Sequence, residues 1–233
     1  MSFRSVHSVP KIMATTDIGA LFDWDGVIVD SSAAHEESWE LLAKEERRPL
    51  PPGHFKAGFG RKNTYIVPEI LGWTRDTGEI IRIGKRKEAL YRDVLKRTSV
   101  SVLPGARDLL EGLRTIGIPC AIGSSTDRLN IETCLNLTSL HEFFAAIISA
   151  DDVIHGKPNP EVFLKAAAAI DRKPARCVVF EDAYAGLEAA HAGGFKSIGV
   201  GTTNPVESLR DKCDLAVHRL NELTADTILK LVT

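Results

Sequence analysis

The chain has 233 residues, of which 44% are hydrophobic and 26% are charged, and its formal net charge is −2 at pH 7. These values are typical of a globular protein, and the balanced charge provides no general attraction for nucleic acid or for an anionic membrane. The length exceeds that of a typical single domain and fits one α/β domain that carries an insertion. Composition and charge therefore predict neither a nucleic-acid partner nor a membrane partner.

Four cysteines stand singly in apolar or helical segments, without CxxC spacing: Cys120, Cys134, Cys177 and Cys213. This pattern favours buried reduced thiols over disulfides or zinc ligands. No apolar run reaches the length of a transmembrane helix. Residues 1–16 lack the apolar segment of a secretory signal, and we interpret them as a flexible tail, with organellar targeting as the alternative. The sequence therefore predicts a cytoplasmic protein.

The first predicted strand, residues 18–22, ends in a pair of acids. Residues 21–27 read Leu-Phe-Asp-Trp-Asp-Gly-Val, so Asp23 and Asp25 stand two positions apart and directly before Gly26. Residues two apart on a strand point to the same side, and the glycine allows a tight turn beside them. Two carboxylates so close are tolerated if a cation neutralises them or if one stays protonated as an acid. This arrangement suits Mg²⁺ with a substrate phosphate, and an ordinary turn rich in Asx residues is the alternative.

Residues 33–101 follow a different pattern from the rest of the chain. They contain amphipathic helical patterns, over about 32–44 and 79–96, that are separated by turn-rich segments. We therefore predict that residues 33–101 form an inserted helical cap domain. The α/β core is expected over residues 17–32 and 102–233.

Beyond this interval, short apolar runs alternate with helical patterns. The runs that predict strands cover residues 118–122, 146–149, 177–180, 197–200 and, more weakly, 214–217. Helical patterns cover residues 105–116 and about 183–191, and another helix is expected to begin at Asn159-Pro160. Strands that alternate with helices predict a parallel sheet. The fold class is therefore α/β, with a doubly wound, Rossmann-like parallel sheet and the helical cap inserted into it.

Three further groups of polar residues lie after predicted strands or before a helix. Ser124 and Ser125 follow the second core strand, where hydroxyls and free N–H groups at a helix start would form an anion cradle. Lys157 stands in a stiff loop rich in proline, and Glu181 and Asp182 end a later strand as a second acidic pair. Each alone also fits a helix cap or a solvated side chain. Because ligands of open parallel sheets bind beyond the carboxyl ends of the strands, we expect these groups to converge.

In combination, these motifs strongly resemble those of the haloacid dehalogenase superfamily of phosphotransferases, in the branch with a helical cap that includes β-phosphoglucomutase. The resemblance covers about residues 17–220. It rests on the segment Asp-Trp-Asp-Gly-Val-Ile-Val-Asp-Ser at 23–31, on Ser124, on Lys-Pro-Asn-Pro at 157–160 and on the Glu-Asp pair at 181–182.

The resemblance implies a role for each core residue. Asp23 would attack the phosphorus and form an aspartyl-phosphate. Asp25 would protonate the leaving oxygen and then activate water. Ser124 and Lys157 would hold the phosphoryl oxygens, with Ser125 beside them as a further substrate contact.

The resemblance also implies a metal site and contacts from the cap. Asp182, the Asp23 carboxylate and the backbone carbonyl of Asp25 would bind Mg²⁺, and Glu181 would join directly or through water. In the cap, Arg61 is the expected substrate contact. His35 is the second expected substrate contact of the cap, and it would either assist Asp25 or satisfy a hinge hydrogen bond. Trp39 is expected to be a core residue, with a platform for a sugar as the alternative. The basic run over residues 82–97 is interpreted as a solvated helix face.

Departures from the family patterns favour some members over others. Dehalogenases lack an acid where Asp25 stands, and phosphonate-cleaving members carry a small residue there. In the cap loop, Ala57 and Gly60 replace the lysine and serine of β-phosphoglucomutase, although Arg61 is kept and Lys56 could supply the charge. We therefore predict a Mg²⁺-dependent phosphatase for a small phosphorylated metabolite such as a sugar or polyol phosphate. The alternatives are a hexose-phosphate mutase and a catalytically silent binding or regulatory module; the oligomeric state is open, and a monomer is compatible with the sequence.

Overall fold

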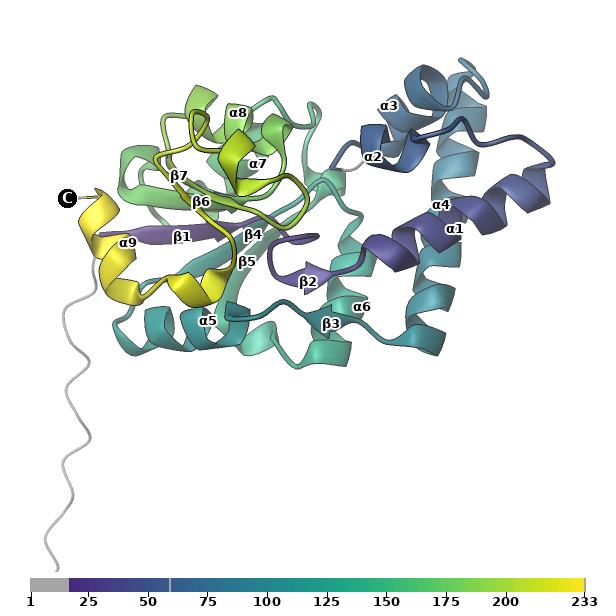
Figure 1. The fold of residues 1–233 in the computed structure, drawn as a ribbon. Helices are drawn as coiled ribbons and strands as arrows, with labels where there is room; N and C mark the ends of the chain where they lie inside the picture. Colours follow the sequence, from purple (N-terminus) through teal and green to yellow (C-terminus); the bar gives the residue numbers. More distant parts are fainter. Residues whose placement is uncertain (1–16, 59, 233) are drawn as a thin grey trace, which may run out of the picture.

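A computed structural model describes residues 17–58 and 60–232. The prediction of a flexible tail over residues 1–16 falls outside this part of the chain. Figure 1 shows an α/β core with a group of helices beside it. Within the described residues, no helix is long and apolar enough to cross a lipid bilayer. The cytoplasmic location stays a prediction.

The core contains a six-stranded parallel sheet in the order β5-β4-β1-β6-β7-β8. Its strands correspond to the six predicted ones: β1 (Gly19–Phe22), β4 (Cys120–Gly123), β5 (Phe144–Ile148), β6 (Cys177–Glu181), β7 (Lys196–Val200) and β8 (Leu215–Val217). In the central register, Leu21 lies opposite Ala121 of β4 and Val179 of β6. The carboxyl end of β1 is therefore flanked by the carboxyl ends of β4 and β6.

Helices cover both faces of this sheet, which confirms the predicted doubly wound fold class (Figure 1). One layer contains α5 (Ala106–Thr115), α6 (Arg128–Thr138) and α9 (Ala225–Val232), and the other contains α7 (Glu161–Ala169) and α8 (Tyr184–Ala192). Strand side chains alternate between the two faces of the sheet. Phe22 packs on the face covered by α5, α6 and α9, and Leu21 packs on the face covered by α7 and α8. Short 3₁₀ turns complete the core at His141–Phe143, Ala150–Asp152, Pro174–Arg176, Val206–Ser208 and Leu220–Glu222.

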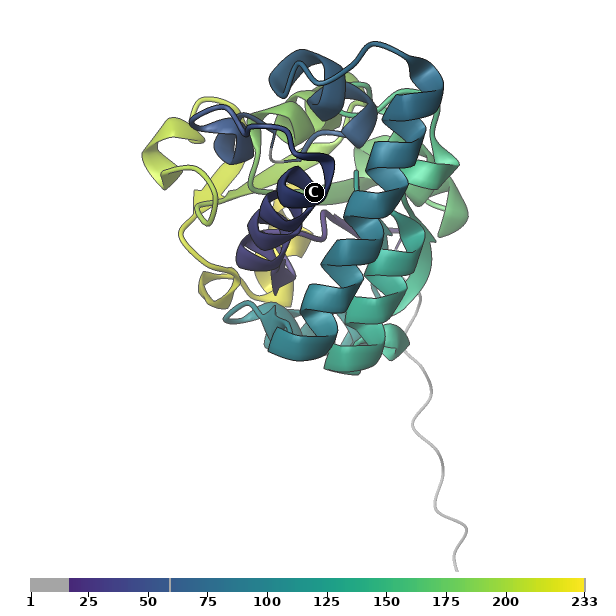
Figure 2. The same cartoon turned by 90° about the vertical axis from the view of Figure 1, so that its right-hand side faces the viewer.

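A helical insert lies between two short strands, β2 (Val29–Asp30) and β3 (Ser101–Val102), which pair antiparallel. Its elements are α1 (Ser32–Glu46), α2 (His54–Gly58), α3 (Asn63–Tyr65), a π-helical turn (Ile66–Ile70) and α4 (Thr77–Thr98). The insert has a hydrophobic cluster of its own that includes Trp39, Leu42 and Ile83. Figure 2 shows α4 running from the insert down beside α6 of the core.

Candidate active site

Asp23 lies at the centre of the sheet, directly after β1. Its N–H donates to the Phe180 carbonyl of β6 at 2.9 Å, which fixes the backbone at the strand end. Its Oδ1 accepts a hydrogen bond from Lys157 Nζ at 2.7 Å, and the same amine donates to Glu181 Oε1 at 2.7 Å. The first acid pair, the lysine loop and the second acid pair therefore converge, as expected for ligand-binding loops at the carboxyl ends of parallel strands.

Three buried carboxylates gather around this lysine. Ligand oxygens of Asp23, Glu181 and Asp182 lie within 4.8 Å of one another, and Lys157 offsets only one of their charges. Burial raises the pKa of Asp23 to about 7 despite the opposing charge of Lys157. Burial also raises the pKa of Asp182, with added repulsion from Glu181 and Asp23.

The donor set fits a divalent cation. Asp182 Oδ1 is buried and has no hydrogen-bond partner in the described part of the chain, so one carboxylate oxygen stays available as a ligand. A charge of +2 would offset the excess of negative charge, and three carboxylates are the oxygen donors that Mg²⁺ prefers. The Thr203 hydroxyl donates to the other oxygen, Oδ2, and thereby orients the Asp182 side chain.

Glu181 has its oxygens occupied within the protein. Its Oε1 accepts from Lys157, and its Oε2 accepts from the N–H groups of Asp182 and Ala183, both at 2.8 Å. A Cβ at position 186 would lie 1.7 Å from Oε1, so Gly186 leaves the space that this carboxylate fills. The structure therefore places Glu181 as the support of Lys157 and of the turn into α8.

Asp25 is held by three donors. The hydroxyls of Ser31 and Thr126 donate to its two oxygens, and His35 Nε2 lies 3.4 Å from Oδ1. Burial alone would raise the pKa of Asp25, but hydrogen bonds from His35, Ser31 and Thr126 outweigh it and hold the pKa at about 2. The carboxylate is therefore ionised in the ligand-free protein, and an anionic phosphate beside it would raise this pKa and allow it to bind a proton.

The loop after β4 places Ser124 and Ser125 in the wall of the same cavity. Helix α6 begins only at Arg128, and its first N–H groups already donate to the carboxylates of Asp127 and Asp151 at 3.0 Å. The expectation that a helix start contributes to the anion cradle is therefore wrong for α6. The serine hydroxyls of the loop remain for an anion.

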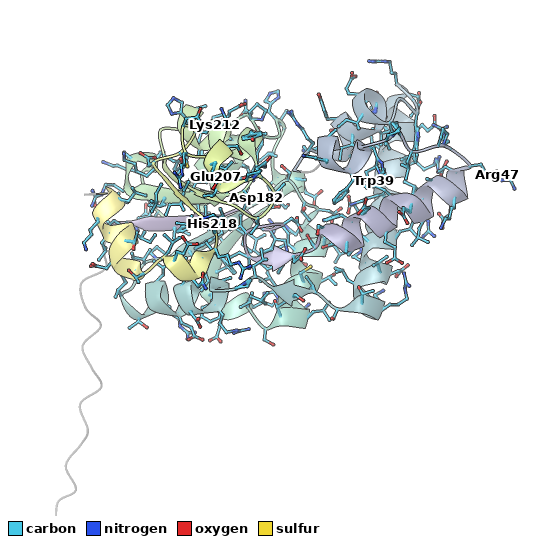
Figure 3. All side chains as sticks on the ribbon, viewed as in Figure 1. Trp39, Arg47, Asp182, Glu207, Lys212 and His218 are labelled. Carbon is cyan, nitrogen blue, oxygen red and sulfur yellow. The ribbon has the colours of Figure 1, made fainter. Side chains whose placement is uncertain are left out.

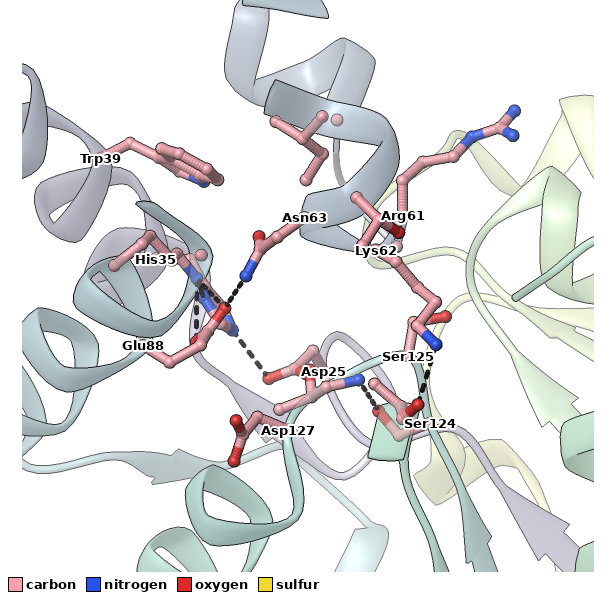
Figure 4. A pocket seen from close by; sticks show the side chains of 18 of the residues that line it. Asp25, His35, Trp39, Arg61, Lys62, Asn63, Glu88, Ser124, Ser125 and Asp127 are labelled. Carbon is pink, nitrogen blue, oxygen red and sulfur yellow. Dashed lines mark hydrogen bonds and ion pairs between the residues drawn. The ribbon is translucent and has the colours of Figure 1, made fainter. Parts of the chain in front are cut away.

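A cavity of about 230 Å³ separates these residues from the helical insert (Figure 4). Its core side is lined by Asp23, Asp25, Ser124 and Ser125, and its insert side is lined by His35, Trp39, His54, Phe55, Arg61, Lys62 and Asn63. Figure 3 shows the same division, with Asp182 in the core and Trp39 in the insert. A small molecule in this cavity would contact both parts of the protein.

The insert residues considered as substrate contacts differ in whether their side chains point toward Asp25. His35 faces Asp25, as one of its two interpretations required. The guanidinium of Arg61 lies over the Tyr65 ring, 4.9 Å from its centroid, and Figure 4 shows it pointing away from Asp25. Trp39 is buried and packs edge-on against Trp73, as expected of a core residue, although it also lines the cavity.

Lys87 completes the surroundings of His35 and was missed as a site residue. Its Nζ lies 2.6 Å from His35 Nδ1 and 3.2 Å from Glu88 Oε1. Because an ammonium group only donates, Nδ1 accepts, and a neutral His35 then carries its proton on Nε2, toward Asp25. The Tyr91 ring stacks on the His35 ring, with centroids 3.9 Å apart, and fixes its plane.

The interpretation of residues 82–97 as a solvated helix face is therefore wrong at one position. Arg82 and Arg86 lie on the surface, each paired with a glutamate of α1, but Lys87 is only 3% exposed. The signal was helical spacing: Lys87 follows the buried Ile83 by four residues and precedes the buried Leu90 by three.

The ends of the central strands of this parallel sheet bring two acid pairs and a lysine together beneath a helical insert. This arrangement is typical of a site for phosphoryl transfer. The chain belongs to the haloacid dehalogenase-like hydrolase family, whose model matches residues 19–194. The predicted family is thereby confirmed, and so is the predicted enzyme class at the level of the family.

Relatives within the family have differing activities. The chain is 34% identical to the chloroplastic 5-amino-6-(5-phospho-D-ribitylamino)uracil phosphatase of Arabidopsis thaliana, over 92% of this chain but only 57% of that protein. It is 30% identical to β-phosphoglucomutase of Bacillus subtilis, over 89% of this chain and 92% of that one. The crystal structure of a family IA, variant 3 hydrolase from Entamoeba histolytica matches with a TM-score of 0.83 and 30% identity, covering 92% of this chain and 99% of the other.

Proposed function

We propose that this protein is a Mg²⁺-dependent phosphatase that acts on a small phosphorylated metabolite through an aspartyl-phosphate, with the helical insert, residues 33–101, as its cap. The observation that supports this proposal most directly is the buried Asp23 carboxylate. It accepts a hydrogen bond from Lys157, belongs to a group of three acids and lines the cavity. This arrangement provides a nucleophile, a cation for the phosphoryl oxygens and donors for a metal.

In the first step, an oxygen of Asp23 attacks the phosphorus while the bond from phosphorus to the leaving oxygen breaks. Asp25, which binds a proton once the anionic phosphate has raised its pKa, gives that proton to the leaving oxygen, so the product leaves as an alcohol. In the second step, water attacks the phosphorus, Asp25 takes the proton of the water, and the bond to Asp23 breaks. His35, Ser31 and Thr126 keep the Asp25 carboxylate in place for both transfers.

Ser124, Ser125 and Lys157 hold the phosphoryl oxygens in this proposal. Asp23 and Asp182 would bind the metal with the backbone carbonyl of Asp25, and Glu181 would act on it through water or through Lys157. Mg²⁺ bound there supplies positive charge that keeps Asp23 ionised and offsets the charge of the phosphate.

The proposed substrate class is a sugar or polyol phosphate. The Arabidopsis relative is named for a substrate with a phosphorylated ribityl chain, and that name supports a polyol phosphate here. The cavity wall mixes hydrogen-bonding side chains such as His35 and Asn63 with the apolar Phe55 and Ile66, which suits a molecule with hydroxyl groups on a carbon chain.

The proposal is tested with an aryl phosphate and Mg²⁺. We expect the native chain to release phosphate, and Asp23→Asn to lose at least about three orders of magnitude in kcat, because the amide keeps the shape but cannot attack. Circular dichroism checks that the variant folds, and Asp211→Asn is the matched control, because Asp211 is exposed and does not line the cavity. Phosphate release by Asp23→Asn near the native rate would refute the assignment.

A further inference from the structure

One lysine of the insert reaches across the cavity to the backbone of the core. Lys62 Nζ donates to the carbonyl of Ala150 at 2.8 Å and to the carbonyl of Val153 at 3.2 Å. Figure 4 shows this side chain extending from the insert toward the core loops beside Ser124 and Ser125. The contact joins segments 88 and 91 residues apart in the chain.

The core segment that receives Lys62 is connected to both acids of the first motif. The N–H of Ala150 donates to the Thr126 carbonyl at 2.9 Å, and the Thr126 hydroxyl donates to Asp25. The same segment continues to Lys157, which binds Asp23. A group that fixes residues 150–157 therefore acts on the surroundings of the acid/base residue and on the lysine that holds the nucleophile.

The stem of Lys62 also crosses this loop at close range. A Cβ at position 156 would lie 2.9 Å from Lys62 Cδ and 3.0 Å from Cγ, so Gly156 provides the space in which the stem lies. Gly156 does not have a positive φ, so its backbone would accept an alanine. The close approach of the Lys62 stem therefore limits the size of the residue directly before Lys157.

We propose that Lys62 is a positioning residue that holds the insert closed over the phosphoryl site and, in the same contact, fixes the loop that carries Lys157. The inference rests on the proposed phosphatase function. The contact forms only when the insert lies against the core, so it stabilises the closed arrangement relative to an open one. Its acceptors are neutral carbonyls; the carboxylates of Asp151 and Glu161 attract the amine without forming an ion pair with it. The contact therefore joins the insert to the core through hydrogen bonds to neutral acceptors, which can break to release product.

The first test replaces Lys62 and follows hydrolysis of 4-nitrophenyl phosphate with Mg²⁺. Lys62→Met keeps the apolar stem and removes the donor, and we expect kcat/KM to fall roughly tenfold because one charged hydrogen bond across the cavity is lost. Lys62→Arg retains a charged donor and should recover most of the loss. The matched control is Lys44→Met, because Lys44 is an exposed lysine in the last turn of α1 that does not line the cavity.

The second test reaches the same contact from the core side. Gly156→Ala should displace the Lys62 stem and lower kcat/KM to a similar degree. If it acts through Lys62, the double variant Lys62→Met, Gly156→Ala will be no slower than Lys62→Met alone. Losses that multiply in the double variant would show that Gly156 acts on Lys157 directly and would overturn the proposed coupling.

Amide hydrogen exchange provides a readout that does not depend on activity. In the ligand-free protein, Lys62→Met should speed exchange in residues 60–66 and 149–156 while Tm stays unchanged. Unchanged exchange there, or native kcat/KM in Lys62→Met, would overturn the inference. If the native chain hydrolyses no phosphate ester, the proposed function fails, whereas the exchange measurement still decides whether Lys62 closes the insert.

Discussion

Gly26 follows the two acids of the first motif and has a φ of +82°, in the left-handed region. A Cβ at this position would lie 2.0 Å from Asp182 Oδ2, on the second acid pair. The glycine of the motif therefore satisfies two requirements at once, a backbone angle and a close approach between β1 and β6. The sequence indicated the first requirement, and the second depends on the fold.

We expect Gly26→Ala to lower the free energy of unfolding by about 1–3 kcal/mol and to weaken Mg²⁺ binding, because the methyl group displaces Asp182. Urea unfolding and calorimetric titration with Mg²⁺ measure the two effects. Gly53→Ala is a matched control: Gly53 also has a positive φ, of +73°, but nothing lies within 4 Å of the added Cβ. Equal effects of the two substitutions on metal binding would contradict the role of the close approach.

At this scale, residues that belong to a local pattern could be predicted, and residues brought in by the fold could not. Asp23 and Asp25 form a local pattern, and the structure gives both the burial and the partners that their chemistry needs. Thr126 is 101 residues from Asp25 in sequence and reaches it only because β4 lies beside β1. Lys62 likewise carries no sequence signal, since its acceptors are backbone carbonyls.

At the scale of elements, the ends of β1 and β6 bring together the acids of two separate motifs. We expect removal of divalent ions to abolish phosphate release and Mg²⁺ to restore it, because Lys157 alone cannot offset three buried carboxylates. Ca²⁺ should restore activity poorly, since its looser coordination misplaces the nucleophile. Assays after treatment with a chelator measure this directly, and full activity in excess chelator would refute a metal-dependent reaction.

Helix α4 connects the insert to the core through a buried acid. Glu88 accepts hydrogen bonds from Asn63 of the insert at 2.6 Å and from Asn130 of α6, and it is the carboxylate partner of Lys87. We expect Glu88→Ala to lower the free energy of unfolding by about 3–5 kcal/mol, because it leaves a buried ammonium group without its counter-charge.

Urea denaturation measures this loss, and Glu45→Ala provides the comparison. Glu45 pairs with Arg86 on the surface of the insert, so its removal should change stability by less than about 1 kcal/mol. A similar small effect for Glu88→Ala would mean that Lys87 is stabilised without its carboxylate.

The strands of the sheet could be predicted because a parallel strand buried on both faces is a continuous apolar run. All six predicted runs form strands, with ends that differ by one or two residues in most cases. The antiparallel pair β2 and β3 was not predicted, since two residues in each strand are too few for a periodic signal. The helix start expected at Ser124 and Ser125 lies a few residues later, because α6 begins at Arg128 with Asp127 as its cap.

At the scale of the whole molecule, the balance between hydrolysis and isomerisation depends on what the insert presents to a second phosphate. Lys56, the residue that could replace the missing cap lysine, lines a second cavity with His218 and Arg219 and does not line the cavity that contains Asp25. Arg61 points away from Asp25. Lys62, Lys85 and Lys87 also line the cavity, but Lys62 is bound to core carbonyls, Lys87 is paired with Glu88, and Lys85 is exposed to solvent. Few cations of the described insert are therefore placed to retain a bisphosphate.

We accordingly expect hydrolysis to exceed isomerisation. One missing charged hydrogen bond amounts to roughly 1.5–3 kcal/mol, which raises the escape of a bisphosphate by about one to two orders of magnitude. The measurement supplies β-glucose 1-phosphate with a trace of its bisphosphate and follows glucose 6-phosphate and inorganic phosphate together. Isomerisation far faster than phosphate release would show that the protein acts as a mutase and would refute the proposed phosphatase activity.

The antiparallel pairing of β2 with β3 has a consequence for how such a protein can diversify. Val29, where the chain leaves the core, lies opposite Val102, where it returns. The two ends of the insert are thus neighbours, and the segment between them can change in length and sequence while the sheet keeps its register and its strand ends. The segment between these two valines also contains Ser31 and His35, which hold Asp25, so a change of the insert that keeps the chemistry must keep these two residues.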